Sequence, residues 1–265
     1  MRIVAIVSDF DGTLIGATQK LSVQGRAAIK HYLANGGRFS IATGRAYEGL
    51  LERVCTELSL DSLQIVRGGS EIVDSRTGKV VWGKYIDSQL VESVIRDLNV
   101  SSELIVFAES GPDLYTIDGK SDPEFATGAN VKDLKTINKN NVPKIAIPPL
   151  YLEDTIFPIY EAVKEKYPTL HIVRTTSRKG MGIDVNDGGA GKHSALLEYS
   201  RLTGIDPQSI LGLGDSYNDY PLLSACGVKV AMGNAPHELK ELADHVVRTQ
   251  EEDGIIDAIK LAEKQ

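Results

Sequence analysis

The sequence is poor in the features that mark disulfide scaffolds, membrane spans and dinucleotide sites. Among its 265 residues only Cys55 and Cys226 are cysteines, which excludes a disulfide framework and favours a reducing, cytoplasmic compartment. No apolar run approaches the roughly 20 residues of a membrane-spanning helix, and the opening run 3–7 is too short for a signal peptide. No G-x-G-x-x-G stretch follows that run, which counts against a dinucleotide-binding protein.

Positive charge is also in deficit. Lys and Arg number 29 against 36 Asp and Glu, giving a net charge of −7, which argues against nucleic acid and membranes as partners. The five histidines show no metal-ligand spacing. The chain is 42% hydrophobic and 25% charged, which is typical of a globular protein able to bury a core. The oligomeric state stays open.

Short apolar runs alternate with longer amphipathic runs at both ends of the chain. The runs 3–7, 39–42 and 210–214 have the length and composition of buried strands. Helical stretches follow them, so we predict an α/β fold with a Rossmann-like parallel sheet and helices on both faces. Ile65-Val66 is expected to begin a third strand of that sheet.

The middle of the chain has a different pattern. Residues 86–184 contain two helical stripes among several strands with hairpin-like links, which is typical of an inserted α+β module. One of these strands, 144–147, is expected to end at Pro148-Pro149, and residues 119–128 form a weak polar stretch. We therefore predict a core made of residues 1–85 and 185–265.

The motif Asp9-Phe10-Asp11-Gly12-Thr13 stands where the first predicted strand ends. Two carboxylates two residues apart repel each other unless a cation or a shared proton lies between them. Gly12 permits a tight turn, whose N–H groups can hold an anion. Because open parallel sheets bind ligands beyond the carboxyl ends of their strands, the motif predicts a ligand site, the alternative being a turn with solvated acids.

A second acidic motif, residues 212–219, also follows an apolar strand. Its acids Asp215 and Asp219 are four residues apart and can share one face of a helical turn. Together the two motifs place carboxylates at two strand tips of one sheet, which suits a hard, oxygen-ligated cation such as Mg²⁺. Read alone, the second motif is also compatible with a helix cap.

Two weaker signals accompany these motifs, and one further residue is assigned only as a helix cap. Thr43-Gly44 follows the second strand and offers a hydroxyl and N–H groups, although a helix cap has the same pattern. Lys192 begins a predicted helix, where the dipole disfavours a cation unless an anion binds beside it, the alternative being a solvated surface lysine. Asn234 precedes Ala235-Pro236 and is expected to cap the next helix.

In order along the chain, four segments resemble the four motifs of the haloacid dehalogenase superfamily: Asp9–Thr13, Thr43–Arg45, Lys192 and Gly214–Asp219. The inserted module resembles the type IIB cap of its Cof-like sugar-phosphate phosphatases, so the resemblance predicts a cap at 86–184. Residues 232–235 and 252–254 also resemble later Cof-like segments. One departure is Arg67-Gly68-Gly69, where many Cof-like members have Asn-Gly-Ala. Arg67 is expected near the seam between core and cap, either contacting substrate or as a structural surface residue.

The resemblance also implies roles for individual residues. Asp9 would be the nucleophile that forms an aspartyl-phosphate, and Asp11 the general acid and base. Mg²⁺ would be held by Asp9, the Asp11 backbone carbonyl and Asp215, with Asp219 and Arg45 in support. The residues implied to hold the phosphoryl group are Phe10 (through its N–H), Thr43, Gly44, Lys192 and Asn218.

These implications predict a Mg²⁺-dependent phosphatase of small phosphorylated metabolites, such as sugar phosphates. A phosphomannomutase-like phosphomutase would use the same aspartyl-phosphate and differ in its product. A metabolite-binding α/β module would bind without turnover. The sequence does not name the substrate, because cap side chains are expected to select it.

Overall fold

The computed structural model describes residues 2–117, 130–177 and 179–264. It divides into two compact units, which we call the core unit (2–82 and 192–264) and the inserted unit (83–191). The predicted polar stretch 119–128 lies outside the described residues. Among the described residues, no helix combines the length and the apolar character needed to span a membrane.

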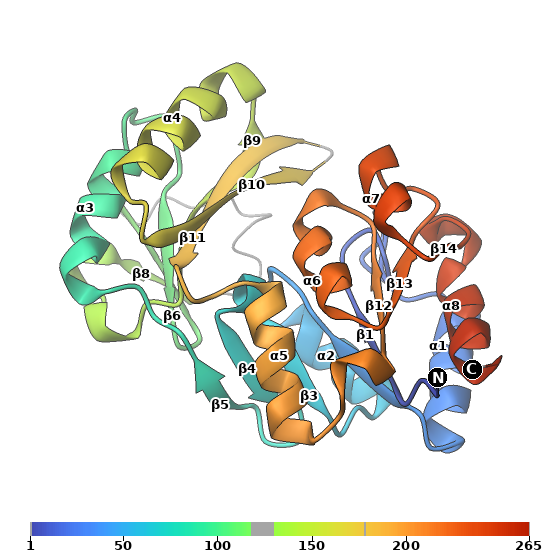
Figure 1. The fold of residues 1–265 in the computed structure, drawn as a ribbon. Coiled ribbons are helices and arrows are strands. Elements are labelled where there is room, and N and C mark those ends of the chain that lie inside the picture. Colours follow the sequence, from blue (N-terminus) through green and yellow to red (C-terminus); the bar gives the residue numbers. More distant parts are fainter. Residues whose placement is uncertain (1, 118–129, 178, 265) are drawn as a thin grey trace. The chain divides into compact units, whose positions relative to one another are not determined.

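The core unit is built on a five-stranded sheet in which all neighbouring strands run parallel (Figure 1). In spatial order the strands are β14 (His245–Val246), β13 (Val228–Ala231), β12 (Ile210–Gly214), β1 (Ala5–Ser8) and β2 (Arg38–Ile41). The helices of this unit are α1 (Val23–Ala34), α2 (Leu50–Leu58), α5 (Lys192–Thr203), α6 (Tyr220–Ala225), α7 (His237–Leu242) and α8 (Gly254–Lys264). The predicted α/β parallel-sheet fold is confirmed.

Alternate residues of β1 face opposite sides of this sheet, as the period of two requires. Ile6 packs into a cluster with α1, α2 and α8, whereas Ala5 and Val7 pack into a second cluster with α5, α6 and α7. Both cysteines are buried and unbonded, one in each cluster. The two apolar layers bury both faces of the sheet, so the loops at the carboxyl ends of its strands start from a well-packed base.

The pairing of the third predicted strand differs from what we expected. β3 (Leu63–Val66) is joined to the parallel sheet by one bridge, between Ile65 and Ala42, and by a hydrogen bond from the Ile41 N–H to the Gln64 side chain. It pairs antiparallel with β4 (Glu71–Asp74) in a separate sheet of three strands that ends with β5 (Lys79–Gly83). The physical reason is the short turn between β3 and β4, which returns the chain alongside β3.

In its described residues, 83–117, 130–177 and 179–191, the inserted unit has a six-stranded mixed sheet and two α-helices (Figure 1). In spatial order the strands are β10 (Leu170–Ser177), β11 (Gly180–Asp187), β9 (Lys144–Tyr151), β6 (Phe107–Ser110), β7 (Asp113–Thr116) and β8 (Asn130–Asp133). Helices α3 (Ser88–Leu98) and α4 (Glu153–Lys166) pack their apolar stripes on one face of this sheet. The assignment of this unit as a cap stays a prediction.

The expectation that a strand ends at the double proline is wrong. β9 runs through Pro148 and Pro149 to Tyr151. The pairing of β9 with β11 shifts register here, because residues 148–150 of β9 lie opposite Gly182 alone, which relieves the ladder where the prolines lack an N–H. Gly182 completes this arrangement, because a Cβ there would lie 2.3 Å from the Ile147 carbonyl oxygen.

Candidate active site

Asp9 belongs to a group of three aspartates, with Asp215 and Asp219, which we call the acidic group. It directly follows β1, and its backbone N–H donates to the carbonyl of Leu213 on β12 (2.8 Å), which extends the strand pairing by one residue. The side chain is only 7% exposed. The parallel sheet therefore carries this carboxylate into a buried position at its carboxyl edge.

Lys192 is buried between two carboxylates. At the start of α5, its Nζ donates to Oδ1 of Asp9 (2.7 Å) and to Oδ1 of Asp219 (2.6 Å). This pairing keeps the ammonium charged, and the two aspartates raise the pKa of Lys192 although burial opposes them. The alternative of a solvated surface lysine is wrong, because the side chain is almost fully buried.

Asp215 follows β12 and lies against the turn of the first motif. The Thr13 hydroxyl donates to its Oδ1 (2.9 Å). Gly12 has a φ of +83°, and a Cβ at that position would lie 2.2 Å from Oδ2 of Asp215. Only glycine allows both the turn and this close approach, so the two acidic motifs are brought together.

Asp219 supports the loop that carries Asp215. Its Oδ2 accepts the backbone N–H groups of Asp215 and Ser216, each at 3.0 Å, while its Oδ1 faces Lys192. The Asp219 side chain is fully buried. Both of its oxygens are therefore engaged by protein donors, which suits support of the loop better than direct contact with a ligand.

The charge balance of this group suits a divalent cation. Asp9, Asp215 and Asp219 each place an oxygen within 4.8 Å of the others. Three carboxylates against one lysine leave two negative charges. Burial, followed by repulsion from Asp219, raises the pKa of Asp9 and raises that of Asp215 to about 6. Such crowded carboxylates are oxygen ligands of the kind that Mg²⁺ prefers.

Asp11 has a different environment from Asp9. Its carboxylate is about half exposed and forms a bidentate pair with Arg45, whose Nε and Nη2 donate to its two oxygens at 2.7 Å each. The guanidinium also lies 5.9 Å from the centre of the Phe10 ring. Arg45 therefore fixes the orientation of the Asp11 side chain.

The other predicted residues occupy the same edge of the sheet. Thr43 follows β2, which pairs with β1 so that Ile41 lies opposite Ser8, and Gly44 comes next. The Thr43 hydroxyl accepts the N–H of Arg45 (3.1 Å). Asn218, in the loop after β12, accepts the hydroxyl of Ser216 at its Oδ1 (2.6 Å).

Phe10 and Arg67 are both buried. The Phe10 ring is fully buried, and its carbonyl accepts the N–H groups of Leu14 and Ile15, which closes the turn. Arg67 is 2% exposed and pairs with Glu71 and with Glu48 (3.3 Å). The alternative of a surface arginine is therefore wrong, and the two glutamates favour a structural role within the core unit.

Asn234 is a residue of this site that the sequence pattern misplaced. The expected helix cap is wrong, because α7 begins at His237 and Pro236 occupies the cap. The Asn234 side chain instead donates to the Gly12 carbonyl and to Oδ2 of Asp215, both at 3.0 Å. Its position just after β13, at the carboxyl edge of the sheet, is the signal that could have found it.

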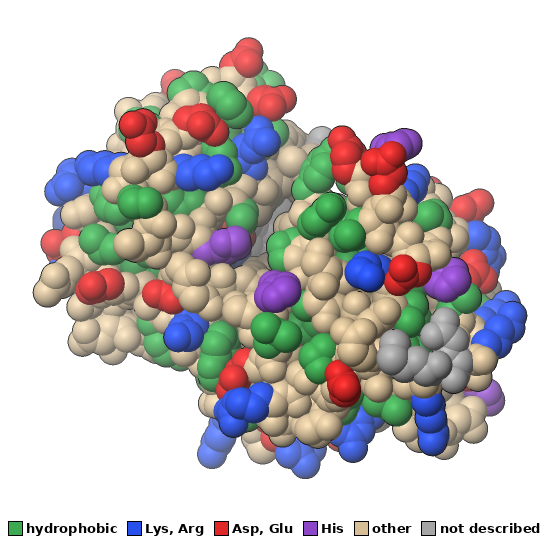
Figure 2. Space-filling model, viewed as in Figure 1, with side chains coloured by type: hydrophobic (Ala, Val, Ile, Leu, Met, Phe, Trp, Pro, Cys, Tyr) green, Lys and Arg blue, Asp and Glu red, His purple; other side chains and the backbone are tan. Residues whose placement is uncertain are grey.

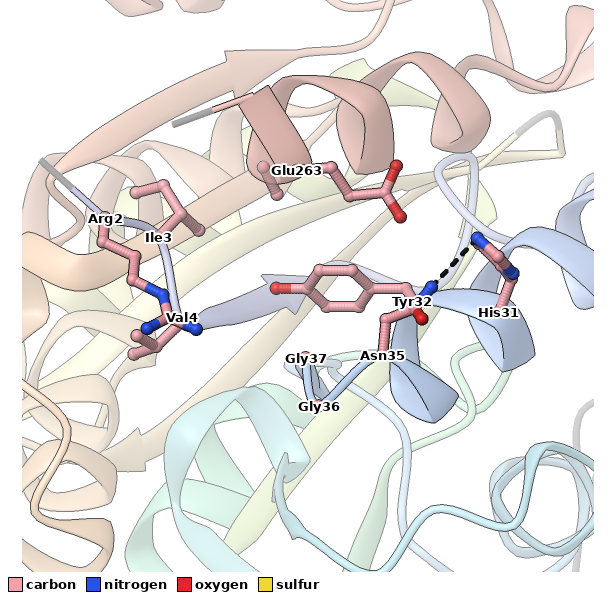
Figure 3. A pocket seen from close by; sticks show the side chains of 10 residues that line it. Arg2, Ile3, Val4, His31, Tyr32, Asn35, Gly36, Gly37 and Glu263 are labelled. Atoms are coloured by element: carbon pink, nitrogen blue, oxygen red, sulfur yellow. Dashed lines mark hydrogen bonds between the residues drawn. The ribbon is translucent and has the colours of Figure 1, made fainter.

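A separate hollow lies at the opposite edge of the core sheet (Figure 3). Arg2, Tyr32 and Glu263 are among the residues that line it, between α1, α8 and the segment before β1. No described atom hydrogen-bonds the buried Tyr32 hydroxyl, and burial raises the pKa of Tyr32 to about 12.

Side chains of both charge signs are interspersed on the molecular face in Figure 2.

The fold and the acidic group together define a class of protein. It is an enzyme with a parallel α/β sheet and with carboxylates gathered beyond the ends of the strands. The model of the haloacid dehalogenase-like hydrolase family matches residues 6–259. The chain belongs to this family. The superfamily predicted from the motifs is therefore confirmed, as is the class of enzyme, a phosphatase-type hydrolase.

Named relatives and solved structures match nearly the whole chain. A 5-amino-6-(5-phospho-D-ribitylamino)uracil phosphatase of Bacillus subtilis is 28% identical over 98% of this chain and 95% of its own length. A phosphoglycolate phosphatase of Methanobrevibacter smithii is 24% identical over 98% of both chains. A haloacid dehalogenase-like hydrolase structure from Bacteroides thetaiotaomicron has a TM-score of 0.83 at 22% identity, covering 98% of this chain and 99% of its own. The subclass IIB sugar phosphatase BT4131 has a TM-score of 0.80 at 21% identity, covering 97% and 98%.

Proposed function

We propose that the protein is a Mg²⁺-dependent phosphatase that hydrolyses small phosphorylated metabolites through an aspartyl-phosphate at Asp9. The observation that carries the proposal is the acidic group at the sheet edge. There Asp9 is buried, oriented by Lys192 and crowded by Asp215 and Asp219. A nucleophile and a cation site thus share one carboxylate, which suits attack on a phosphoryl group.

The cation would be held by Asp9, the Asp11 backbone carbonyl and Asp215. When bound, Mg²⁺ supplies the charge that offsets both the carboxylates and the phosphoryl oxygens. Lys192 supplies a further positive charge beside Asp9, at 2.7 Å. These charges explain how a chain with a net charge of −7 can admit an anionic substrate.

The first step is transfer of the phosphoryl group to Asp9. An oxygen of the Asp9 carboxylate attacks phosphorus, and the bond from phosphorus to the leaving oxygen breaks. Asp11, entering this step as the carboxylic acid, gives its proton to that oxygen, so the alcohol departs neutral. Phe10 (by its N–H), Thr43, Gly44, Lys192 and Asn218 hold the phosphoryl oxygens during the transfer.

The second step returns the enzyme to its starting state. The Asp11 carboxylate takes a proton from water as the water oxygen attacks phosphorus. The bond between phosphorus and Asp9 breaks, inorganic phosphate forms, and Asp11 is again the acid. Arg45 orients Asp11 through the bidentate contact at 2.7 Å and must release it when the proton moves.

The substrate class follows from what the relatives share. Their names specify a phosphoribitylamino-uracil, phosphoglycolate and sugar phosphates, whose organic parts differ and whose phosphomonoester is common. Hydrolysis of a phosphomonoester is therefore the reaction that we assign. These names favour a phosphatase over the phosphomutase alternative, which would yield an isomer and little free phosphate.

The test is phosphate release. Wild-type protein should hydrolyse p-nitrophenyl phosphate, stop with EDTA and recover with Mg²⁺. A screen of phosphorylated metabolites for free phosphate would then identify the organic part. Turnover that is indifferent to EDTA, or an isomeric product without phosphate, would contradict the proposal.

A further inference from the structure

Asn234 makes three side-chain hydrogen bonds that join three separate loops of the core unit. Its Nδ2 donates to the Gly12 carbonyl and to Oδ2 of Asp215, each at 3.0 Å. Its Oδ1 accepts the backbone N–H of Gln250 at 3.0 Å. The side chain thus ties the turn after β1 to the loop after β12 and to the segment before α8.

The orientation of this amide is fixed by its partners. A reversed amide would turn its oxygen toward two acceptors, the Gly12 carbonyl and the Asp215 carboxylate, and its NH₂ group toward a donor, the Gln250 N–H. The position therefore requires a side chain that donates twice on one side and accepts on the other. Asparagine meets this requirement, and aspartate, which has no donor, does not.

We infer that Asn234 is a positioning residue that holds the Asp215 carboxylate ready for the divalent cation; this inference rests on the proposed function. Thr13 donates to Oδ1 of Asp215 and Asn234 donates to Oδ2. Both donors are neutral, so they fix the carboxylate without cancelling the negative charge that attracts a cation. Partners of this kind around metal ligands typically change metal affinity about 10- to 100-fold when removed.

The close packing around Gly12 explains why the hydrogen bond from Asn234 to Asp215 is needed. Because a Cβ at Gly12 would lie 2.2 Å from Oδ2, the carboxylate is packed against the backbone of the turn. Without the Asn234 donor, Oδ2 and the Gly12 carbonyl would face each other as two acceptors. We therefore expect Asp215 to rotate away from the cation site in variants that lack this donor.

The test compares Asn234→Asp with Asn234→Ala. Aspartate suits loops and caps as well as asparagine does, so a merely structural loop residue would tolerate the change. It removes both donated hydrogen bonds, however, and adds a charge beside Asp215. Asn234→Ala removes the donors without adding charge and keeps the test open should the aspartate variant fold poorly. Asn35→Asp is the matched control, since Asn35 is an exposed asparagine bonded to His31 at the opposite edge of the sheet.

Two readouts measure the effect: the Mg²⁺ concentration for half-maximal phosphate release, and the rise in melting temperature that Mg²⁺ causes without substrate. Both Asn234 variants should need about 10- to 100-fold more Mg²⁺ and show a smaller rise at a given concentration, with kcat at saturating Mg²⁺ less affected. Asn35→Asp should match the wild type. If Asn234→Asp binds Mg²⁺ as tightly as the wild type or tighter, the inference is overturned. A wild type without Mg²⁺-dependent turnover would instead refute the proposed function.

Discussion

Each unit of the molecule contains a buried lysine between two carboxylates, and the two groups differ in where they stand on their sheets. In the core unit, Lys192 contacts Asp9 at 2.7 Å and Asp219 at 2.6 Å, beyond the ends of parallel strands. In the inserted unit, Lys144 lies 3.1 Å from Asp184 and 3.6 Å from Glu109, on strands β9, β11 and β6. The same charges thus occupy a sheet edge in one unit and a sheet face in the other.

The difference lies in what surrounds each lysine. Glu109 pairs directly across the strands with Lys144, and the Phe107 ring lies 5.9 Å from the Lys144 ammonium, so these charges take part in the cross-strand pairing of the sheet. At the core edge a further carboxylate, Asp215, joins the group and leaves an excess of negative charge. The core group thus carries the larger excess of negative charge and lies at strand tips, whereas the Lys144 group lies within strands. We expect the first group to serve chemistry and the second to serve structure.

The largest effect is expected at Asp9. Asp9→Asn removes the attacking oxygen while keeping the shape of the side chain, so nearly all turnover of p-nitrophenyl phosphate should be lost. A steady-state assay, with folding checked by circular dichroism, measures the change. Wild-type turnover in the Asp9→Asn variant would refute the assignment of the nucleophile.

Lys192→Met should reduce kcat by roughly 10²- to 10³-fold, because the variant lacks the positive donor beside the nucleophile. The side chain is buried, and methionine keeps much of its apolar volume. The same phosphate-release assay gives the rate. A loss of less than about threefold would mean that Lys192 only balances the buried aspartates.

Lys144→Met is the matched change in the inserted unit. It leaves Glu109 and Asp184 buried without their shared lysine, and breaking such a set typically costs about 3–5 kcal/mol in the free energy of unfolding. Burial raises the pKa of Asp184, so protonation of that carboxyl will lessen the loss. Urea unfolding measures the change. Turnover of p-nitrophenyl phosphate by the folded variant should stay within a few-fold of wild type, and a drop of about 10²-fold would erase the contrast between the two lysines.

The smallest effect concerns pH. Burial lowers the pKa of His171 on β10 below its ordinary 6.5, against an opposing effect of Asp184. The unfolded chain therefore binds a proton more readily, so stability is lost as pH falls below about 6.5. His171→Gln should lose less of its unfolding free energy between about pH 7.5 and about pH 5.5 than the wild type does. Equal losses in urea titrations would show that His171 does not contribute.

The positions of the candidate site residues could be predicted because strand tips of a parallel sheet meet at one edge. Asp9, Thr43 and Asp215 each follow a short apolar run, and that local rule was enough to place them on one edge. The burial of Lys192 between two aspartates could not be predicted, because it depends on how α5 packs against the sheet. Asn234 was missed for the same reason: its partners lie 222 and 19 residues away.

The inserted unit was harder to predict from local patterns. The prolines of β9 indicated a strand end, and the register shift between β9 and β11 explains why the strand continues. Arg67 in the core unit was also misjudged because its partners could not be seen in the local pattern. Its charge indicated a surface or substrate contact, and its two glutamate partners account for its burial.

The most direct test of the central claim is to trap the phosphorylated enzyme. A quenched reaction with excess phosphomonoester, reduced by borohydride, converts an aspartyl-phosphate to homoserine, which peptide mass spectrometry locates in the sequence. The account predicts homoserine in place of Asp9, dependent on both substrate and Mg²⁺. Phosphate release with homoserine at another aspartate, or with no reduced residue at all, would contradict it.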